Sequence, residues 1–309
     1  MKKIFGNFVI GASMVVSAGI LAANPAQAGT ISGVTIGGTA ASDYYVYGVS
    51  GNQTVLLPNT TTNVQNVLNG NATSPTGNVE LRVSSEQPGF DFSKNTTLSG
   101  NIGGKNITLS SLTLSDWTTT YKNTGKSFGE FWFDQFYNAA GLSSKEGLIK
   151  IAFGLPSNTP SASVRTAVFN TFKSIKGLER SSDPNISYVN QDDNSGLIKI
   201  GLAGHFNLKT AYSQTGSPFA IFKNLVSDGF QASEVVKYTY NGVTDYLYSF
   251  AATNSGLVAS DDGISHTGNY EVTIDGVPPA KVPEPSVMLG LFGVAGIVAA
   301  QRKLKKVSA

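Results

Sequence analysis

The sequence predicts an α+β fold with an antiparallel, strand-rich framework and two or three helices between about residues 127 and 228. Before residue 123, short β-like runs alternate with Gly, Asn and Pro. The apolar spacing then changes to a helical period, and an Asn-Gly dipeptide between two aromatic runs follows near the end. Because the chain has no cysteine, its stability must come from a packed core.

The first 28 residues have the order of a secretory signal peptide. Lys2 and Lys3 precede an apolar stretch, and Ala26 and Ala28 supply the small residues of a cleavage site for signal peptidase. The next part, residues 29–276, is therefore expected to be an exported globular body. It is long enough for one domain, or for two that divide near residue 123.

Strands are expected where apolar and aromatic residues gather between turn residues, at 43–49, 78–85 and 105–117. The five residues Gly-Leu-Ile-Lys-Ile occur twice, at 147–151 and 196–200, and are interpreted as two similar buried strands. The dipeptide Asn241-Gly242 predicts a tight hairpin turn within 235–250, because both positions tolerate a positive φ.

Helices are expected in the middle of the body. Phe128, Trp132 and Phe136 recur at helical spacing, so a helix is predicted over 127–142, with Ser127 as its cap. A second helix is predicted over 161–177, where Val and Phe follow the same period. A third is predicted to begin at Ser217-Pro218 and to end near residue 227.

The end of the chain has three consecutive parts. Residues 277–285 are rich in proline and predict an extended stalk. Residues 286–301 form an apolar run, shorter than the roughly 20 residues that span a bilayer comfortably, and predict a short membrane helix. The basic residues of 302–309 predict a tail that stays in the cytoplasm.

Pro283, Glu284 and Pro285, followed by the apolar run and by Arg302 and Lys303, resemble the PEP-CTERM sorting signal. The resemblance implies that an exosortase processes the tail and that the body reaches the cell envelope, the cell surface or the extracellular matrix. It also implies that the producing cell makes an exopolysaccharide, which is then an expected partner of the body. Residues 182–205 are similar to uncharacterised cyanobacterial members of this group, and this similarity implies no particular activity.

Charge disfavours a nucleic-acid partner. Without the leader and the tail, the 22 basic and 20 acidic residues of the chain become 16 and 19, and the basic residues form no cluster. The leading prediction is therefore a non-enzymatic surface or matrix protein without a cofactor. A carbohydrate-binding module is the first alternative, and a polysaccharide hydrolase is the second.

The two alternatives depend on different residues. Glu130 and Asp134 lie one helical turn apart beside Trp132, and this trio is a candidate sugar-binding or hydrolytic site. The same spacing is typical of the solvated face of an amphipathic helix. Sugar stacking would require exposed aromatics on one face, and the candidates are Trp117, Tyr44, Tyr45 and Tyr47.

One loop is a candidate calcium site. Carboxylate and amide oxygens, the ligands that calcium prefers, are concentrated at Asp183, Asn185, Asp192 and Asn194. The spacing does not fit an EF-hand, and Asp and Asn are also common turn residues, which is the alternative interpretation. His205 and His266 have no neighbour at metal-ligand spacing, so no other metal site is expected.

Overall fold

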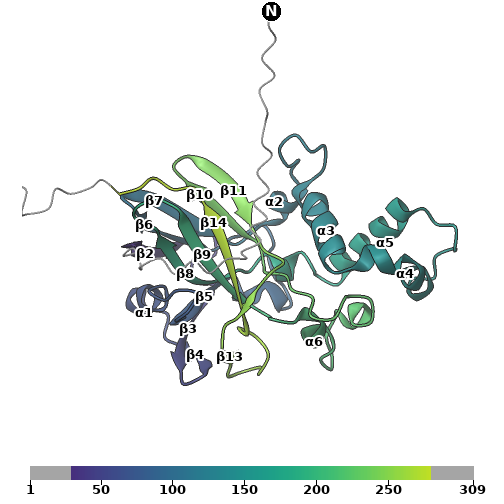
Figure 1. Ribbon diagram of the computed structural model, residues 1–309, viewed down its shortest axis with the longest axis horizontal. Helices are drawn as coiled ribbons and strands as arrows, with labels where there is room; N and C mark the ends of the chain where they lie inside the picture. The colour runs from purple at the N-terminus through teal and green to yellow at the C-terminus, as the bar shows by residue number, and fades with distance from the viewer. Residues whose placement is uncertain (1–28, 280–309) are drawn as a thin grey trace, which may run out of the picture. The chain divides into compact units, whose positions relative to one another are not determined.

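Two sheets form the framework of residues 29–279, the part of the chain that the computed structural model describes (Figure 1). The nine strands of sheet A are β1 (Gly29–Thr30), β3 (Tyr44–Ser50), β4 (Gln53–Leu57), β5 (Gly77–Leu81), β8 (Asn185–Gln191), β9 (Ile198–Gly204), β12 (Thr253–Asn254), β13 (Val258–Ala259) and β14 (Gly268–Ile274). Their order is β12-β14-β9-β8-β5-β3-β4-β13, and β1 pairs with β8. Every pairing is antiparallel except that of β13 with β4.

Sheet B is smaller and entirely antiparallel. Its five strands are β2 (Ser32–Gly37), β6 (Thr97–Ile102), β7 (Lys105–Ser110), β10 (Val236–Tyr240) and β11 (Val243–Leu247). They run in the order β11-β10-β7-β6-β2. The strand β11 therefore forms one edge of the sheet.

The two sheets share one hydrophobic core. In sheet A, Val79 and Leu81 alternate with polar neighbours and point toward sheet B, where Leu98 and Leu109 are equally buried. Each such side chain contributes roughly 1.5–3 kcal/mol to the free energy of unfolding. The strand β8 is buried along its whole length, so its polar residues lie inside the protein.

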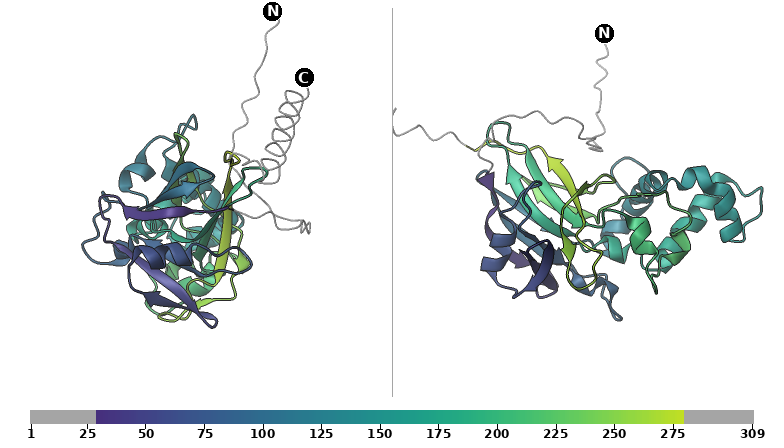
Figure 2. Two further views of the ribbon diagram at one scale, coloured as in Figure 1. Left: turned by 90° about the vertical axis from the view of Figure 1, so that its left-hand side faces the viewer. Right: turned by 60° about the horizontal axis from the view of Figure 1, so that its bottom comes forward.

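Six α-helices and four short 3₁₀ helices complete the described part of the chain. The α-helices are α1 (Thr61–Val67), α2 (Leu114–Thr118), α3 (Phe128–Ala139), α4 (Glu146–Ala152), α5 (Ser161–Ser174) and α6 (Leu208–Tyr212). The 3₁₀ helices are η1 (Val83–Glu86), η2 (Leu142–Lys145), η3 (Glu179–Ser181) and η4 (Ala220–Phe222). Figure 2 shows that α3, α4 and α5 gather beside the sheets rather than covering their faces.

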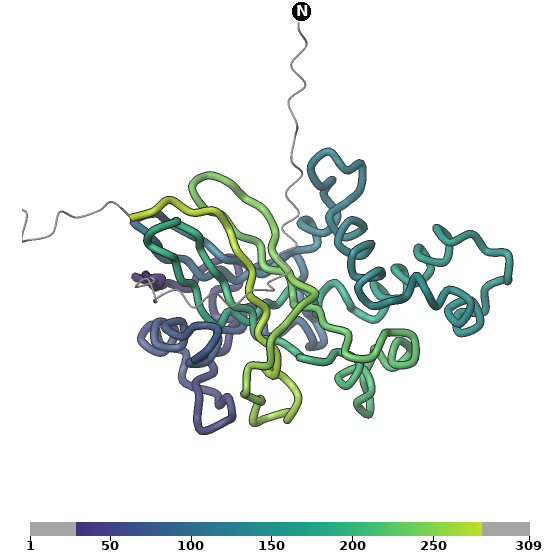
Figure 3. Tube along the Cα trace, in the orientation of Figure 1, coloured from purple at the N-terminus to yellow at the C-terminus, as the bar shows by residue number. Residues whose placement is uncertain are grey.

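The helical part has its own core. The tube in Figure 3 leaves the sheets after β7 and again after β9, and both excursions run into this part. Its core is largely aromatic, with Trp117, Trp132 and Phe172 almost completely buried. The ring centroids of Trp117 and Trp132 lie 5.3 Å apart in an edge-to-face arrangement.

The α+β fold class and the antiparallel framework are confirmed. So are the helices over 127–142 and 161–177, which correspond to α3 and α5. Ser127 caps α3, as the sequence indicated, and Glu130 completes a capping box that was not predicted. The hairpin β10–β11 turns at Asn241 and Gly242, with φ of 49° and 79°.

Other predictions were wrong. Four α-helices, α3 to α6, lie between residues 127 and 228, where two or three were expected. The first copy of Gly-Leu-Ile-Lys-Ile lies in the helix α4, whereas the second leads into the strand β9. In α4 only Ile149 is buried, whereas Ile198 and Ile200 of β9 both face a core. The surroundings, and not the five residues, decide the structure.

The third predicted helix, over 217–227, is reduced to the three residues of η4. This segment forms a series of short turns rather than one continuous helix. Its apolar side chains are nevertheless buried, at Phe219, Phe222, Leu225 and Val226. Tertiary packing thus overrides the helical signal of Ser217-Pro218.

Two predicted strands end early for local reasons. The run 78–85 stops at Leu81, because Arg82 adopts a left-handed conformation with φ of 64° and η1 follows. The run 105–117 stops at Ser110, because Thr113 and Asp116 form a capping box that starts α2.

Both ends of the described body meet at Gln191, the last residue of β8. Gly29 pairs with Gln191 in the sheet, and the Gln191 side-chain amide donates to the carbonyl of Val277 over 2.9 Å. The Val277 amide donates to the Tyr240 hydroxyl over 3.0 Å. The start of the predicted stalk is therefore fastened to the body.

Candidate functional site

A cleft with a volume of about 600 Å³ opens on the face of sheet A that points away from sheet B. Because Val79 and Leu81 point into the shared core, Glu80 between them must point to the opposite face. Its partners on the neighbouring strands are Tyr45 of β3 and Asn185 of β8. These three residues form the floor of the cleft.

Five further acidic residues line the cleft, and two of them, Asp183 and Glu234, reach it from other parts of the chain. Asp183 lies just before β8, and Glu234 lies just before β10. We call the cleft lined by Glu80, Asp183 and Glu234 the acidic cleft. Its remaining walls come from the segments around α6 and η4 and from the loop that follows β13.

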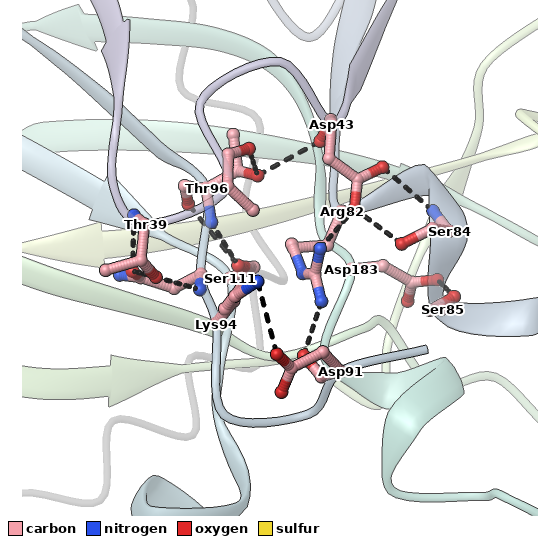
Figure 4. A network of polar contacts seen from close by, with 12 residues as sticks. Thr39, Asp43, Arg82, Ser84, Ser85, Asp91, Lys94, Thr96, Ser111 and Asp183 are labelled. Carbon is pink, nitrogen blue, oxygen red and sulfur yellow. Dashed lines mark hydrogen bonds and ion pairs between the residues drawn. The ribbon is translucent and has the colours of Figure 1, made fainter. Parts of the chain in front are cut away.

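The carboxyl groups of the acidic cleft are only partly hydrogen-bonded. Glu234 Oε2 accepts from the Asn185 backbone amide over 3.0 Å and from its side-chain amide over 3.4 Å. Asp183 accepts from the Ser85 hydroxyl through one oxygen, as Figure 4 shows. Its other oxygen, Oδ1, has no hydrogen-bond partner within the described residues, although Asp183 is only 6% exposed. Asn185 Oδ1 also has no partner there, and Asn185 is only 7% exposed.

The nearby arginines neutralise other acids. Arg82 directly precedes η1, which contains Ser84 and Ser85. It is paired with Asp43 and donates to the Asp91 carbonyl over 2.6 Å (Figure 4). Arg180 is paired with Glu86 at the rim of the cleft. Within residues 29–279, Glu80, Asp183 and Glu234 form no ion pair.

Burial without an ion pair changes the acidity of these three carboxyl groups. Burial raises the pKa of Glu80 to about 7, and the negative charge of Glu86 acts in the same direction. Burial also raises the pKa of Asp183 and that of Glu234 well above their ordinary range, and the negative charge of each neighbouring acid adds to the effect. At neutral pH the cleft therefore contains both protonated and ionised carboxyl groups.

A second hollow, of about 650 Å³, lies between the hairpin β10–β11 and the strand β14. We call it the tyrosine groove, because its lining includes Tyr121, Tyr238, Tyr240, Tyr246 and Tyr248. All except Tyr240 are partly exposed.

Hydrogen bonds hold the tyrosine rings in place. The Tyr121 hydroxyl donates to Asp245 over 2.9 Å, and Gln135 donates to the Tyr248 hydroxyl over 2.7 Å. The acids of the groove are largely neutralised, since Asp245 is paired with Lys122 and Glu271 with Lys199. The groove is thus a fixed aromatic surface with a polar, slightly acidic rim.

The residues predicted as a sugar site do not come together and have structural roles. Trp132 lies at the inner wall of the acidic cleft, but its side chain is completely buried in the helical core. Glu130 accepts from the Ser127 backbone amide over 2.9 Å in the capping box of α3. Asp134 is paired with Lys126 and, over 2.9 Å, with Arg165. The solvated-face interpretation describes the two carboxylates.

The candidate stacking residues separate into two groups. Trp117 is only 1% exposed and donates to the Ser182 hydroxyl over 2.7 Å. Tyr47 is 7% exposed, and Tyr44 is packed against the core of the sheets. Tyr45 and Tyr47 both line the acidic cleft, and Tyr45, at 42% exposed, is the more accessible of the two.

The four calcium candidates are not brought together. Asp183 and Asn185 lie at one end of β8, and Asp192 and Asn194 lie beyond the other end, about 20 Å away at the usual rise of a strand. Asp192 accepts from the backbone amides of Asn194 and Ser195 and shapes a turn. Among residues 29–279, no group of three His, Asp or Glu side chains is arranged to hold a metal ion.

The sequence did not identify the acidic cleft. One local signal existed: Glu80 stands alone between Val79 and Leu81 in a strand that is otherwise buried. Asp183 and Glu234 gave none, because only the sheet topology brings them to Glu80.

Several predictions lie outside the described residues. They are the signal peptide with Ala26 and Ala28, the sorting signal with Pro283, Glu284 and Pro285, the membrane helix over 286–301 and the basic tail with Arg302 and Lys303. No helix between residues 29 and 279 has both the length and the apolar character needed to cross a membrane.

Comparison with known proteins adds no assignment. The chain matches no protein-family model, no curated protein and no solved structure.

Proposed function

We propose that the protein is an exported surface or matrix protein whose body binds a neutral polysaccharide in the tyrosine groove. The observation that carries the proposal is the gathering of partly exposed tyrosine rings around one hollow of about 650 Å³. This volume is in the range of ligand-binding pockets.

The chemistry of the groove favours a sugar chain. A sugar ring has apolar C–H faces that stack on aromatic rings and hydroxyl groups that bind to polar groups at the edge. Tyrosine rings stack on the C–H faces, and the carboxylates of Asp245, Glu271 and Asp275 line the groove and accept hydrogen bonds from the sugar hydroxyl groups. Because these edge groups are acidic, a neutral polysaccharide fits better than an anionic one.

Substituting Tyr238→Ala or Tyr248→Ala is expected to weaken polysaccharide binding about tenfold each. Loss of one stacking contact of about 1.4 kcal/mol corresponds to that factor in Kd. The measurement is affinity electrophoresis in gels that contain a soluble β-glucan, mannan or galactan, with alginate as an anionic comparison.

Tyr44→Ala is the matched control, because Tyr44 is a partly buried tyrosine of sheet A outside the groove. Its mobility shift should equal that of the unsubstituted protein. Equal binding by all three variants, with unchanged melting temperatures, would remove the groove from the proposal.

Export is proposed from the terminal motifs alone. In cells with an active exosortase, mass spectrometry of the secreted or envelope-bound protein should find a chain that begins at Gly29 and ends near Pro283–Pro285. In cells without the exosortase, the chain should retain Arg302 and Lys303 and stay with the membrane through residues 286–301. An intact C-terminus in every fraction of both strains contradicts the sorting proposal.

A further inference from the structure

The acidic cleft has features that polysaccharide binding in the tyrosine groove does not use. Three carboxyl groups from separate elements face one cavity, and none of them forms an ion pair within the described residues, because the lining Arg180 is paired with Glu86. Burying a charge without a partner is costly, so such an arrangement lowers the stability of the fold. Groups of this kind are characteristic of sites that transfer protons.

Unpartnered oxygens show that the cleft has unused binding capacity. Asp183 Oδ1 and Asn185 Oδ1 are buried, line the cleft and have no hydrogen-bond partner in residues 29–279. A buried oxygen of this kind is rare in folded proteins and is usually satisfied by water or by a ligand. A ligand that donates several hydrogen bonds would satisfy both oxygens.

An exposed ring lies beside the first acid. Tyr45 is the direct cross-strand partner of Glu80, and directly opposite residues have Cβ atoms about 5 Å apart. Because its ring is 42% exposed, it offers a stacking platform next to a carboxyl group. A ring of this kind beside two acids fits a sugar unit with a glycosidic oxygen at its edge.

We propose that the acidic cleft is a catalytic site that hydrolyses glycosidic bonds, with Glu234 as the general acid and Glu80 as the general base. This activity lies beyond the binding function proposed for the tyrosine groove, and it departs from the expectation of a non-enzymatic protein. The two sites share no lining residue.

The two glutamates differ in a way that assigns their roles. Burial and the negative charges of Asp183 and Glu80 raise the pKa of Glu234 well above its ordinary range, so Glu234 keeps the proton that a general acid gives. This effect outweighs the two hydrogen bonds that Glu234 accepts from Asn185. Burial raises the pKa of Glu80 to about 7, so near pH 7 part of Glu80 is the ionised carboxylate that a general base needs.

The reaction balances with water as the only co-reactant. Glu234 gives its proton to the glycosidic oxygen as the bond from that oxygen to the anomeric carbon breaks. Glu80 takes a proton from a water molecule, whose oxygen forms the new bond to the anomeric carbon. The products are two chains with one new reducing end, and proton exchange with solvent restores both glutamates.

The test is release of reducing ends from soluble β-glucan, mannan, galactan and the exopolysaccharide of the producing cells, between pH 4 and pH 8. Glu80→Gln and Glu234→Gln are each expected to lower the rate by about 10²–10⁴-fold. Glu146→Gln is the matched control, since Glu146 is on α4 and far from the cleft in the fold. Its rate should be unchanged.

Further measurements distinguish this proposal from its alternatives. For the unsubstituted protein, the rate should fall as the pH drops below about 7, because Glu80 gains a proton and can no longer act as the base. Binding in the tyrosine groove should persist in both glutamine variants, which shows that they fold and separates this proposal from the binding function. No release of reducing ends from any of the four polysaccharides, or equal rates in Glu80→Gln and the unsubstituted protein, would overturn the assignment. Cleavage of casein in their place would overturn the substrate class.

Discussion

Replacing Trp132 by alanine is expected to lower the free energy of unfolding by about 3–5 kcal/mol. The side chain is completely buried, and its ring packs against Trp117, Phe136 and Phe172 with centroid distances of 5.2–5.8 Å. Alanine would leave a cavity at the centre of the helical core. Urea unfolding followed by circular dichroism measures the change.

Ile151→Ala is the control for this experiment. Ile151 also lies in the helical part, on α4, but its side chain is 80% exposed. Its substitution should change the free energy of unfolding by less than about 0.5 kcal/mol. A loss below about 1 kcal/mol in Trp132→Ala would mean that the tryptophan is not the centre of a packed core.

Glu80→Gln is expected to stabilise the protein at neutral pH by about 2–3 kcal/mol and to have little effect on stability at pH 4.5. The folded pKa of Glu80, about 7, lies above the ordinary value of 4.5, so the folded state holds this proton more tightly than the unfolded chain. The contribution of this proton to the free energy of unfolding is complete below pH 4.5 and is lost as the pH rises through 7. Glutamine has no charge to bury and avoids this loss.

The difference between the two proteins is the quantity to measure, because other groups titrate in the same range. Burial lowers the pKa of His266 to about 4, so its contribution has the opposite sign and is lost as the pH falls below 6.5. Urea unfolding of both proteins at several pH values from 4.5 to 7.5 cancels this contribution. A difference that does not change with pH would show that Glu80 is not held in a protonated state.

Local signals explain what the sequence predicted well. The cap at Ser127, the aromatic period of α3 and the Asn241-Gly242 turn each act within a few residues. Where the structure depends on distant partners, prediction failed. Residues 147–151 became a helix and residues 198–200 a strand because their neighbours differ.

The candidate sites illustrate the same limit. Trp132 was predicted as a sugar platform from the residues beside it, but the partners that bury it include Trp117 and Phe172, which follow or precede it by many residues. Glu80, Asp183 and Glu234 meet only because β5 and β8 pair and because the chain returns to the sheets just after Glu234. No spacing along the chain encodes that meeting.

The junction at Gln191 brings the two ends of the described body together. Gly29 pairs with Gln191 in the sheet, and the Gln191 side chain donates to the carbonyl of Val277, which also lines the tyrosine groove. Asn185, on the floor of the acidic cleft, lies at the other end of β8, about 20 Å away. A support coupled to the chain directly after Val277 would therefore begin beside the groove and about 20 Å along β8 from the floor of the cleft.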